Sequence, residues 1–202
     1  MEHVQLLKAV DFAAKKHVNQ VRKGDNSPYI NHPIGVANYI SQLGGVSDLN
    51  TLIGAILHDT VEDTGTSFEE IETEFGVDVA NIVREVTDDK SLPKHERKKQ
   101  QIIHAAHAST QAKLVKLADK YYNLLDIQRI HPKGWDQKRI QGYCVWAKAV
   151  VDVIRGTNKN LEDALDAFFA STINTAEFGS FPAIPQDTDL AVFLQEYYDH
   201  IL

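Results

Sequence analysis

The stretch ILHDTVEDT, residues 56–64, closes an apolar run with one histidine and three carboxylates. If this run is a helix, Asp59 lies on the same apolar stripe as Leu52 and Ile56. An ionised carboxylate in an apolar setting costs several kcal/mol unless a cation compensates it. The stretch is therefore either a charged helix end or part of a metal site, and its own residues leave both interpretations open.

A second carboxylate lies inside an apolar face further along the chain. In the segment AKLVKLADKYYNLLDI, Asp119 falls on a helical stripe with Val115 and Tyr122. One such carboxylate is compatible with a buried hydrogen-bonding group. Two of them, distant in sequence and joined by His58, indicate a shared cation.

A further imidazole, His32, precedes Pro33 at the entrance of another predicted helix, where the proline restricts its backbone. The candidate metal ligands are then His32, His58, Asp59 and Asp119. Imidazole nitrogens with carboxylate oxygens suit Mn²⁺, Fe²⁺ or Zn²⁺, and the absence of thiolates weighs against a structural zinc site. Such a cation lowers the pKa of water, so that water becomes a nucleophile near neutral pH.

Two more acidic residues follow the His-Asp pair. Glu62 lies one helical turn beyond His58, and Asp63 lies one turn beyond Asp59, provided that the helix continues that far. Carboxyl groups within hydrogen-bond reach of a bound water can position it and move its protons. Glu62 and Asp63 are the candidate catalytic acid/base pair.

The order His…His-Asp…Asp resembles that of the HD-domain metal-dependent phosphohydrolases. The segments YINHPIGVA, AILHDTVEDT, FGVDVANIVREVTDDK and KLVKLADKYYNL resemble the hydrolase domain of RelA/SpoT homologues. They are most similar to the small alarmone hydrolases, the group that includes the metazoan SpoT homologue. The resemblance covers roughly residues 6–170, with a departure at Leu125, where a basic residue is common in the family.

This resemblance implies a single HD-domain helical bundle that removes the 3′-pyrophosphate of ppGpp or pppGpp with Mn²⁺, giving GDP or GTP and pyrophosphate. It implies metal binding by the four ligands above and proton handling by Glu62 and Asp63. It also implies a set of substrate-binding residues, which are Arg22, Lys23, Lys94, Asn123, Arg139 and Tyr143. Fe²⁺ and Zn²⁺ remain open as the metal.

Two other functions stay open at this point. The metal centre would serve equally for another phosphorylated nucleotide, for instance the 2′-phosphate of NADPH, because one sequence describes the substrate pocket poorly. A non-catalytic alarmone-binding domain is the third hypothesis. Glu62 and Asp63 argue against it, since a binding protein does not need a pair of groups that activates water.

The elements that must position these residues are helices, and the predicted fold class is all-α. Apolar periodicity and capping signals predict helices over about 4–19, 33–43, 48–59, 67–75, 77–88, 93–107, 111–129, 135–156 and 161–170. No alternating strand pattern of useful length is present. We expect residues 1–170 to form the HD-type domain and residues 171–202 to form a linker and one helix, which docks on the domain or on a partner.

Composition limits the classes of protein that remain. The chain has 202 residues, 43% hydrophobic and 24% charged, and a formal net charge of −7, which argues against nucleic-acid binding. A single cysteine, Cys144, allows no internal disulfide and favours a reducing, cytoplasmic compartment. No window is apolar enough to span a membrane. Homo-oligomerisation stays open. An anionic small molecule remains compatible because basic residues cluster locally, at Arg22-Lys23, at 94–99, and at Lys113, Lys116 and Lys120.

Overall fold

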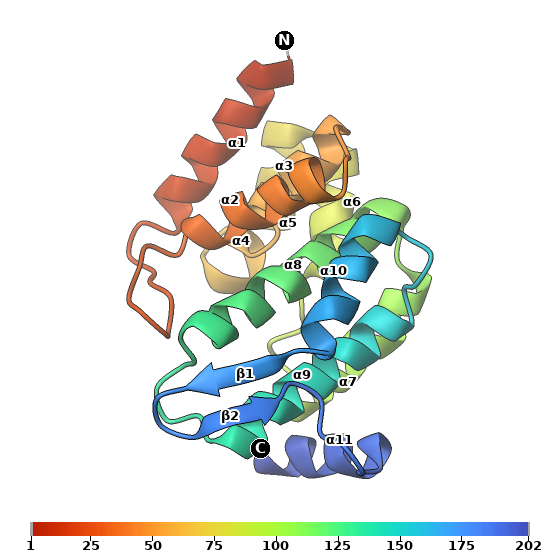
Figure 1. The fold of residues 1–202 in the computed structure, drawn as a ribbon. Coiled ribbons are helices and arrows are strands. Elements are labelled where there is room, and N and C mark those ends of the chain that lie inside the picture. The colour runs from red at the N-terminus through yellow and green to blue at the C-terminus, as the bar shows by residue number, and fades with distance from the viewer. Residues whose placement is uncertain (1, 202) are drawn as a thin grey trace.

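The computed structural model describes residues 2–201 as a bundle of helices with one short hairpin (Figure 1). The elements before the hairpin are α1 (Glu2–Lys16), α2 (Asn31–Asn38), the π-helical turn η1 (Tyr39–Leu43), α3 (Leu49–Leu57), α4 (Thr60–Asp63), α5 (Phe68–Phe75), α6 (Val77–Val86), α7 (Lys94–His107), α8 (Thr110–Arg129), α9 (Gln137–Asp152) and α10 (Lys159–Phe169). The predicted all-α fold class is confirmed, since the hairpin is the one sheet among these described residues.

Side-chain caps begin several of these helices. Ser67 accepts a hydrogen bond from the Glu70 backbone N–H at the start of α5, as the capping-box pattern predicts. Asp136 accepts from the Arg139 N–H at 2.8 Å and so begins α9 two residues later than the predicted start at Trp135. Each cap stabilises its helix by about 1 kcal/mol, because it satisfies a backbone donor that has no partner within the helix.

The central helix is α8, which packs against α2, α3, α6, α9 and α10 (Figure 1). Its apolar residues Leu114, Leu117 and Leu124 are buried in the main core. Burial of each such side chain contributes about 1.5–3 kcal/mol. A helix held on several sides is a rigid support, and α8 carries Asp119, one of the candidate ligands.

The segment after α10 folds into a hairpin and a last helix. Strands β1 (Thr172–Thr175) and β2 (Gly179–Pro182) pair antiparallel, and α11 (Leu190–His200) follows. The helix was predicted; the hairpin was not, because four-residue strands are too short for alternation to stand out. Ile173 and Phe181 face each other across the hairpin and are buried in the core. The division of the chain at residue 170 stays a prediction.

None of the helices described in residues 2–201 has the length and hydrophobicity needed to cross a lipid bilayer.

Candidate metal centre and substrate pocket

Three separate elements bring the four candidate ligands together. His32 lies in the first turn of α2, His58 and Asp59 lie between α3 and α4, and Asp119 lies in α8. The His32 Nε2 atom is 3.5 Å from Asp59 Oδ2 and 3.2 Å from Asp119 Oδ1. The His58 Nε2 atom is 3.0 Å from Asp59 Oδ2 and 3.8 Å from Asp119 Oδ1. Two imidazoles and two carboxylates therefore point at one small volume.

The helix that was predicted to run through Asp59 ends earlier. Helix α3 stops at Leu57, and Asp59, with φ −98° and ψ −3°, begins the short α4. The Thr60 hydroxyl donates to the Leu57 carbonyl at 2.6 Å and closes this break. The continuous stacking of acid groups expected from an unbroken helix is therefore wrong. The break instead lets the neighbouring His58 and Asp59 side chains converge on one point.

The hydrogen bonding of His58 fits a bound cation. Its Nδ1 atom lies 2.7 Å from the Ala55 carbonyl oxygen, and a carbonyl only accepts, so Nδ1 carries the proton. In the neutral imidazole the buried Nε2 then presents a lone pair toward Asp59 and Asp119. These facing lone pairs need a positive charge between them, which either a proton on Nε2 or a bound cation supplies, and backbone-anchored histidines of this kind are typical metal ligands. His32, His58 and Asp59 each offer a ligand atom within 4.8 Å of the others.

The same electrostatics appear in the titration of these groups. Burial lowers the pKa of His58, but attraction by Asp59 and Asp119 outweighs it and raises that pKa to about 9. Burial raises the pKa of Asp59, yet the two imidazoles hold it well below its ordinary value. For Asp119, Lys120 is the largest of the charges that overcome burial and lower its pKa. Asp59 and Asp119 are therefore held as carboxylate anions by the positive charges that face them.

Glu62 lies at the edge of this centre, in α4. Its Oε2 atom accepts a hydrogen bond from the Asp88 backbone N–H at 3.2 Å, and Arg97 Nη1 lies 3.8 Å from its Oε1 atom. Burial, followed by repulsion from Asp88 and Asp59, raises the pKa of Glu62 to about 7. A carboxyl group that titrates near neutrality can both accept and return a proton, which suits general acid/base catalysis.

Asp63 has a different environment from its neighbour. It accepts hydrogen bonds from Gln20 Nε2 at 2.8 Å and from Lys90 Nζ at 2.7 Å. These partners come from the loop after α1 and the loop before α7, so Asp63 ties three segments together. Its oxygens are already engaged by donors, which indicates a role in holding the site more than in proton transfer.

A polar cavity of about 200 Å³ surrounds the centre. Besides the ligands and both acids, its lining includes Lys98 from α7 and Lys116 and Lys120 from α8. Lys120 pairs with Asp119 at 2.8 Å, whereas among the described residues the side-chain Nζ atoms of Lys98 and Lys116 have no hydrogen-bonded or ion-paired partner. Burial and the charge of Lys120 lower the pKa of Lys116 to about 8. Burial with the charges of Lys120 and Lys94 holds the pKa of Lys98 well below its ordinary value, so an anion in this cavity would favour both ammonium forms. Like charges gathered in one cavity favour an anionic ligand with several negative oxygens.

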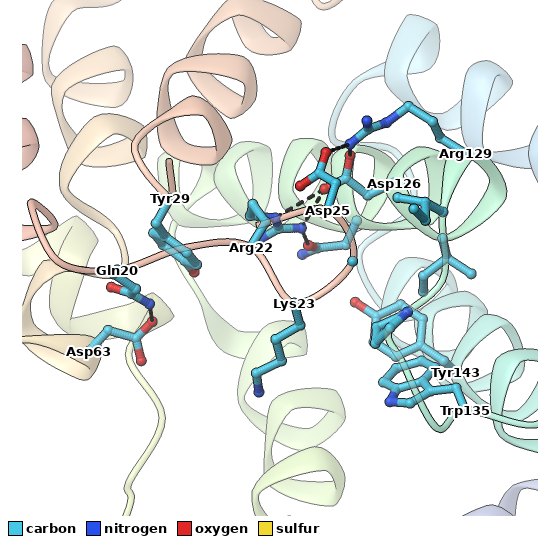
Figure 2. Close-up of a pocket in the computed structure, with 15 residues that line it drawn as sticks. Gln20, Arg22, Lys23, Asp25, Tyr29, Asp63, Asp126, Arg129, Trp135 and Tyr143 are labelled. Carbon is cyan, nitrogen blue, oxygen red and sulfur yellow. Dashed lines mark hydrogen bonds and ion pairs between the residues drawn. The ribbon is translucent and has the colours of Figure 1, made fainter. Parts of the chain in front are cut away.

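A second cavity, of about 300 Å³, adjoins the first. Figure 2 shows Trp135 and Tyr143 on one wall, Gln20 and Asp63 on the other, and Lys23 between them. The Trp135 and Tyr143 ring centroids are 5.7 Å apart. Both cavities share Tyr29, Asp63, Asn123 and Tyr143, and the outer one adds the apolar residues Ile127, Ile130 and Pro132.

Four of the six predicted substrate residues line these cavities: Arg22, Lys23, Asn123 and Tyr143. Arg22 is not a free cation, because it pairs with Asp126 at 2.8 Å and donates to Asn123 Oδ1 at 2.8 Å (Figure 2). Asn123 in turn donates to Asp119 Oδ1 at 2.6 Å. This chain of bonds connects the outer cavity to the candidate metal centre.

Lys94 and Arg139, the other two predicted substrate residues, lie beside the cavities. Burial, and then repulsion by Arg139, Lys23 and Arg97, lowers the pKa of Lys94. The Arg139 guanidinium lies 4.8 Å from the centre of the Trp135 ring. These four cations therefore form a basic group next to the aromatic wall, where a phosphate outside the outer cavity would be attracted.

The sequence reasoning did not select Tyr29, Asp88 or the three cavity lysines as site residues. The Tyr29 hydroxyl donates to Asp59 Oδ2 at 2.5 Å, and so orients a candidate ligand. Lys116 and Lys120 are four residues apart and flank the acidic residue in the otherwise apolar segment of α8. This pair of lysines on a helical stripe predicted to be buried was the signal in the sequence that could have identified them. Lys98 belongs to the basic cluster at 94–99 but was not distinguished from its neighbours there, and Asp88 carries no comparable local signal.

Residues 9–148, which include all four candidate ligands, match the sequence model of a family described as the HD domain. The match extends over more than half of the chain. The chain belongs to the HD-domain family.

Named relatives of this HD-domain protein cover most of its length. It is 58% identical over 165 residues to guanosine-3′,5′-bis(diphosphate) 3′-pyrophosphohydrolase MESH1 of Xenopus tropicalis, which covers 81% of this chain and 92% of that protein. It is 54% identical over 169 residues to MESH1 of Homo sapiens, covering 83% of this chain and 94% of the relative. The predicted resemblance to the alarmone-hydrolase group is thereby confirmed.

A solved structure shares the fold of this HD-domain protein. It belongs to a metazoan orthologue of SpoT, described as hydrolysing ppGpp and acting in starvation responses. The two match with a TM-score of 0.80 and 52% identity, over 82% of this chain and 93% of the other.

Proposed function

We propose that this protein hydrolyses ppGpp and pppGpp at the 3′ position and releases pyrophosphate with GDP or GTP. The observation that carries this proposal is the pair of adjoining cavities, one cationic around the candidate metal ligands and one lined by Trp135 and Tyr143. A purine nucleotide with a 3′-pyrophosphate has two matching parts. Its aromatic base suits the cavity with Trp135 and Tyr143, and its highly charged phosphate chains suit the cationic cavity. Relatives that bear this activity in their names match over nine-tenths of their own length, which supports the same reaction.

We assign His32, His58, Asp59 and Asp119 as ligands of a divalent cation and Mn²⁺ as that cation. Two imidazoles and two carboxylates without a thiolate suit Mn²⁺, and Fe²⁺ or Zn²⁺ are the competing fits. The buried Nε2 lone pair of His58 supports the assignment. When bound, such a cation supplies Lewis acidity that activates water and neutralises charge on a phosphoryl oxygen.

The chain's own groups account for the remaining requirements of the reaction. Glu62 accepts a proton from the attacking water, because its carboxyl is poised near pH 7 at the edge of the centre. Asp63 fixes the loop geometry around it through Gln20 and Lys90. Lys98 and Lys116 attract the 3′-phosphates into the inner cavity.

The nucleoside and its 5′-phosphates occupy the outer cavity in this proposal. Tyr143 and Trp135 offer ring faces to the base, and Asn123 is placed at the junction of the two cavities. Arg22 holds Asn123 in place, and Lys23 reaches into the cavity (Figure 2). Lys94 and Arg139 attract the 5′-phosphates from outside it.

A product assay with purified protein and Mn²⁺ on ppGpp, NADPH and GTP in parallel tests the proposal. The expected result is fastest turnover of ppGpp, with GDP and pyrophosphate formed in equal amounts. Removal of the NADPH 2′-phosphate at much higher efficiency would assign the centre to a different nucleotide. Tight binding of ppGpp without any product would instead identify a binding domain.

A further inference from the structure

The C-terminal helix α11 packs directly against one face of α9. Arg139, Gly142, Tyr143 and Trp146 follow one another on this face at helical spacing. Tyr197 of α11 is 2% exposed, and its ring lies against Gly142. A Cβ atom at position 142 would approach the Tyr197 Cγ atom to 2.6 Å and its Cβ atom to 2.8 Å. Any side chain at position 142 would clash with Tyr197, so this close contact requires glycine.

The ammonium of Lys98 lies where α7, α9 and α11 meet. Its Nζ atom is 3.2 Å from the Trp146 ring centre, 4.7 Å from that of Tyr143 and 5.6 Å from that of Tyr197. Aromatic faces attract a cation at such distances and hold it in a preferred direction. Lys98, Tyr143 and Trp146 all line the inner cavity. The three aromatic rings around the Lys98 ammonium therefore include one from α11, that of Tyr197.

Further contacts fix α11 in this position. Lys138 of α9 pairs with Glu196 at 2.7 Å, and the Lys99 ammonium lies 5.4 Å from the centre of the Tyr198 ring. Helix α11 lies outside the residues that match the HD-domain model, which end at 148. Figure 1 shows it beneath α9, at the bottom of the view.

We propose that Tyr197 is a positioning residue of the substrate site. Its ring confines Lys98 between Tyr143 and Trp146, so that the ammonium is directed into the inner cavity toward the substrate's phosphates. Helix α11 then contributes to substrate binding by holding a residue that lines the inner cavity. The inference rests on the proposed function for the identity of the anion, and on the contacts above for the role of the tail.

Steady-state kinetics of full-length variants on ppGpp with Mn²⁺ test this role. Tyr197→Ala is expected to raise KM roughly tenfold, the effect of losing most of one charged contact, with kcat within about twofold and metal content unchanged. Tyr197→Phe keeps the ring and should restore the wild-type KM. Val192→Ala, at an exposed position of the same helix, is the matched control and should leave KM unchanged.

A double-mutant cycle separates positioning from general destabilisation. If Tyr197 acts through Lys98, Tyr197→Ala should add nothing to KM in a Lys98→Met background. An equal increase in KM in both backgrounds would overturn the proposal, as would an unchanged KM in Tyr197→Ala alone.

Gly142→Ala provides a second variant in case Tyr197→Ala does not fold. Alanine normally favours a helix over glycine, so a loss of function here reports displacement of the Tyr197 ring. It should raise KM as Tyr197→Ala does, without loss of helical content. A wild-type KM in Gly142→Ala with the thermal midpoint preserved would contradict the role of this contact.

Titration calorimetry with inorganic pyrophosphate distinguishes failure of this inference from failure of the proposed function. Weaker pyrophosphate binding by Tyr197→Ala than by Val192→Ala would support the positioning role even if wild-type protein left ppGpp intact. Normal turnover of ppGpp with the same KM and pyrophosphate affinity in both variants would retain the function and overturn the role of Tyr197.

Discussion

The Nε2 atom of His58 lies 3.0 Å from the Oδ2 atom of Asp59, its neighbour in sequence. Adjacent residues of an unbroken helix diverge by about 100°, so this convergence depends on the end of α3 at Leu57. The break directs an imidazole lone pair and a carboxylate at the same point. It also leaves Glu62, in the single turn of α4, beside that point rather than on it.

Loss of a candidate ligand should release the metal without unfolding the protein. Asp59→Asn or Asp119→Asn should weaken Mn²⁺ binding by at least about 100-fold, since even partners outside the coordination sphere contribute 10–100-fold. Elemental analysis after dialysis, with circular dichroism for helical content, measures this effect. Asp126→Asn is the control, because Asp126 lies on α8 as Asp119 does but pairs with Arg22 of the loop after α1. Unchanged metal content in both ligand variants would contradict the assignment.

Glu62→Gln should separate catalysis from metal binding. The amide preserves an acceptor for the Asp88 N–H, so the structure and metal content should persist. It cannot take a proton, and turnover should fall roughly 10²-fold or more. Asp63→Asn should cost less, because its carboxylate is engaged with Gln20 and Lys90. Near-normal rates in both variants would mean that the acid pair is dispensable.

The raised pKa of Glu62 predicts a pH-dependent stability difference in metal-free protein. Because the folded-state pKa, about 7, exceeds the ordinary 4.5, the native state binds the proton more tightly. Its contribution to unfolding free energy is present below about pH 4.5 and is lost as pH rises through 7. Glu62→Gln avoids this loss and should be more stable than wild type by about 1–3 kcal/mol at pH 8, but not at pH 5.

Urea unfolding at the two pH values measures this difference. Glu72→Gln, an exposed glutamate in α5, serves as the control and should show little change at either pH. A stability gain of the same size at pH 5 and pH 8 would show that the amide acts through packing and not through charge.

The position of bond cleavage follows from where the charges lie. The candidate ligands and Lys116 surround one end of the paired cavities, and the aromatic wall lies at the other. Water should therefore attack the phosphorus bonded to the ribose 3′-oxygen, and intact pyrophosphate should leave the nucleotide. Hydrolysis of ppGpp in H₂¹⁸O should place the label in pyrophosphate and leave GDP unlabelled. Release of orthophosphate from the 3′ chain would show attack at the terminal phosphorus.

Local sequence determined most of the helices and the candidate ligands. The 3.6-residue period marks which face of a segment is buried, so a carboxylate such as Asp119 on an apolar stripe is visible without any structure. A capping residue such as Ser67 similarly marks where a helix begins. These signals depend on neighbours within one or two turns, and a single sequence contains them in full.

Only the tertiary structure decided which charges meet. Lys98 and Asp88 join the inner cavity because α7 and α6 pack beside α8 and α9, and no periodicity within either segment encodes that approach. The contact of Tyr197 with Gly142 joins residues 55 positions apart in sequence. Such pairings depend on how whole helices pack, because burial fixes the inward face of each helix but not which helix it faces.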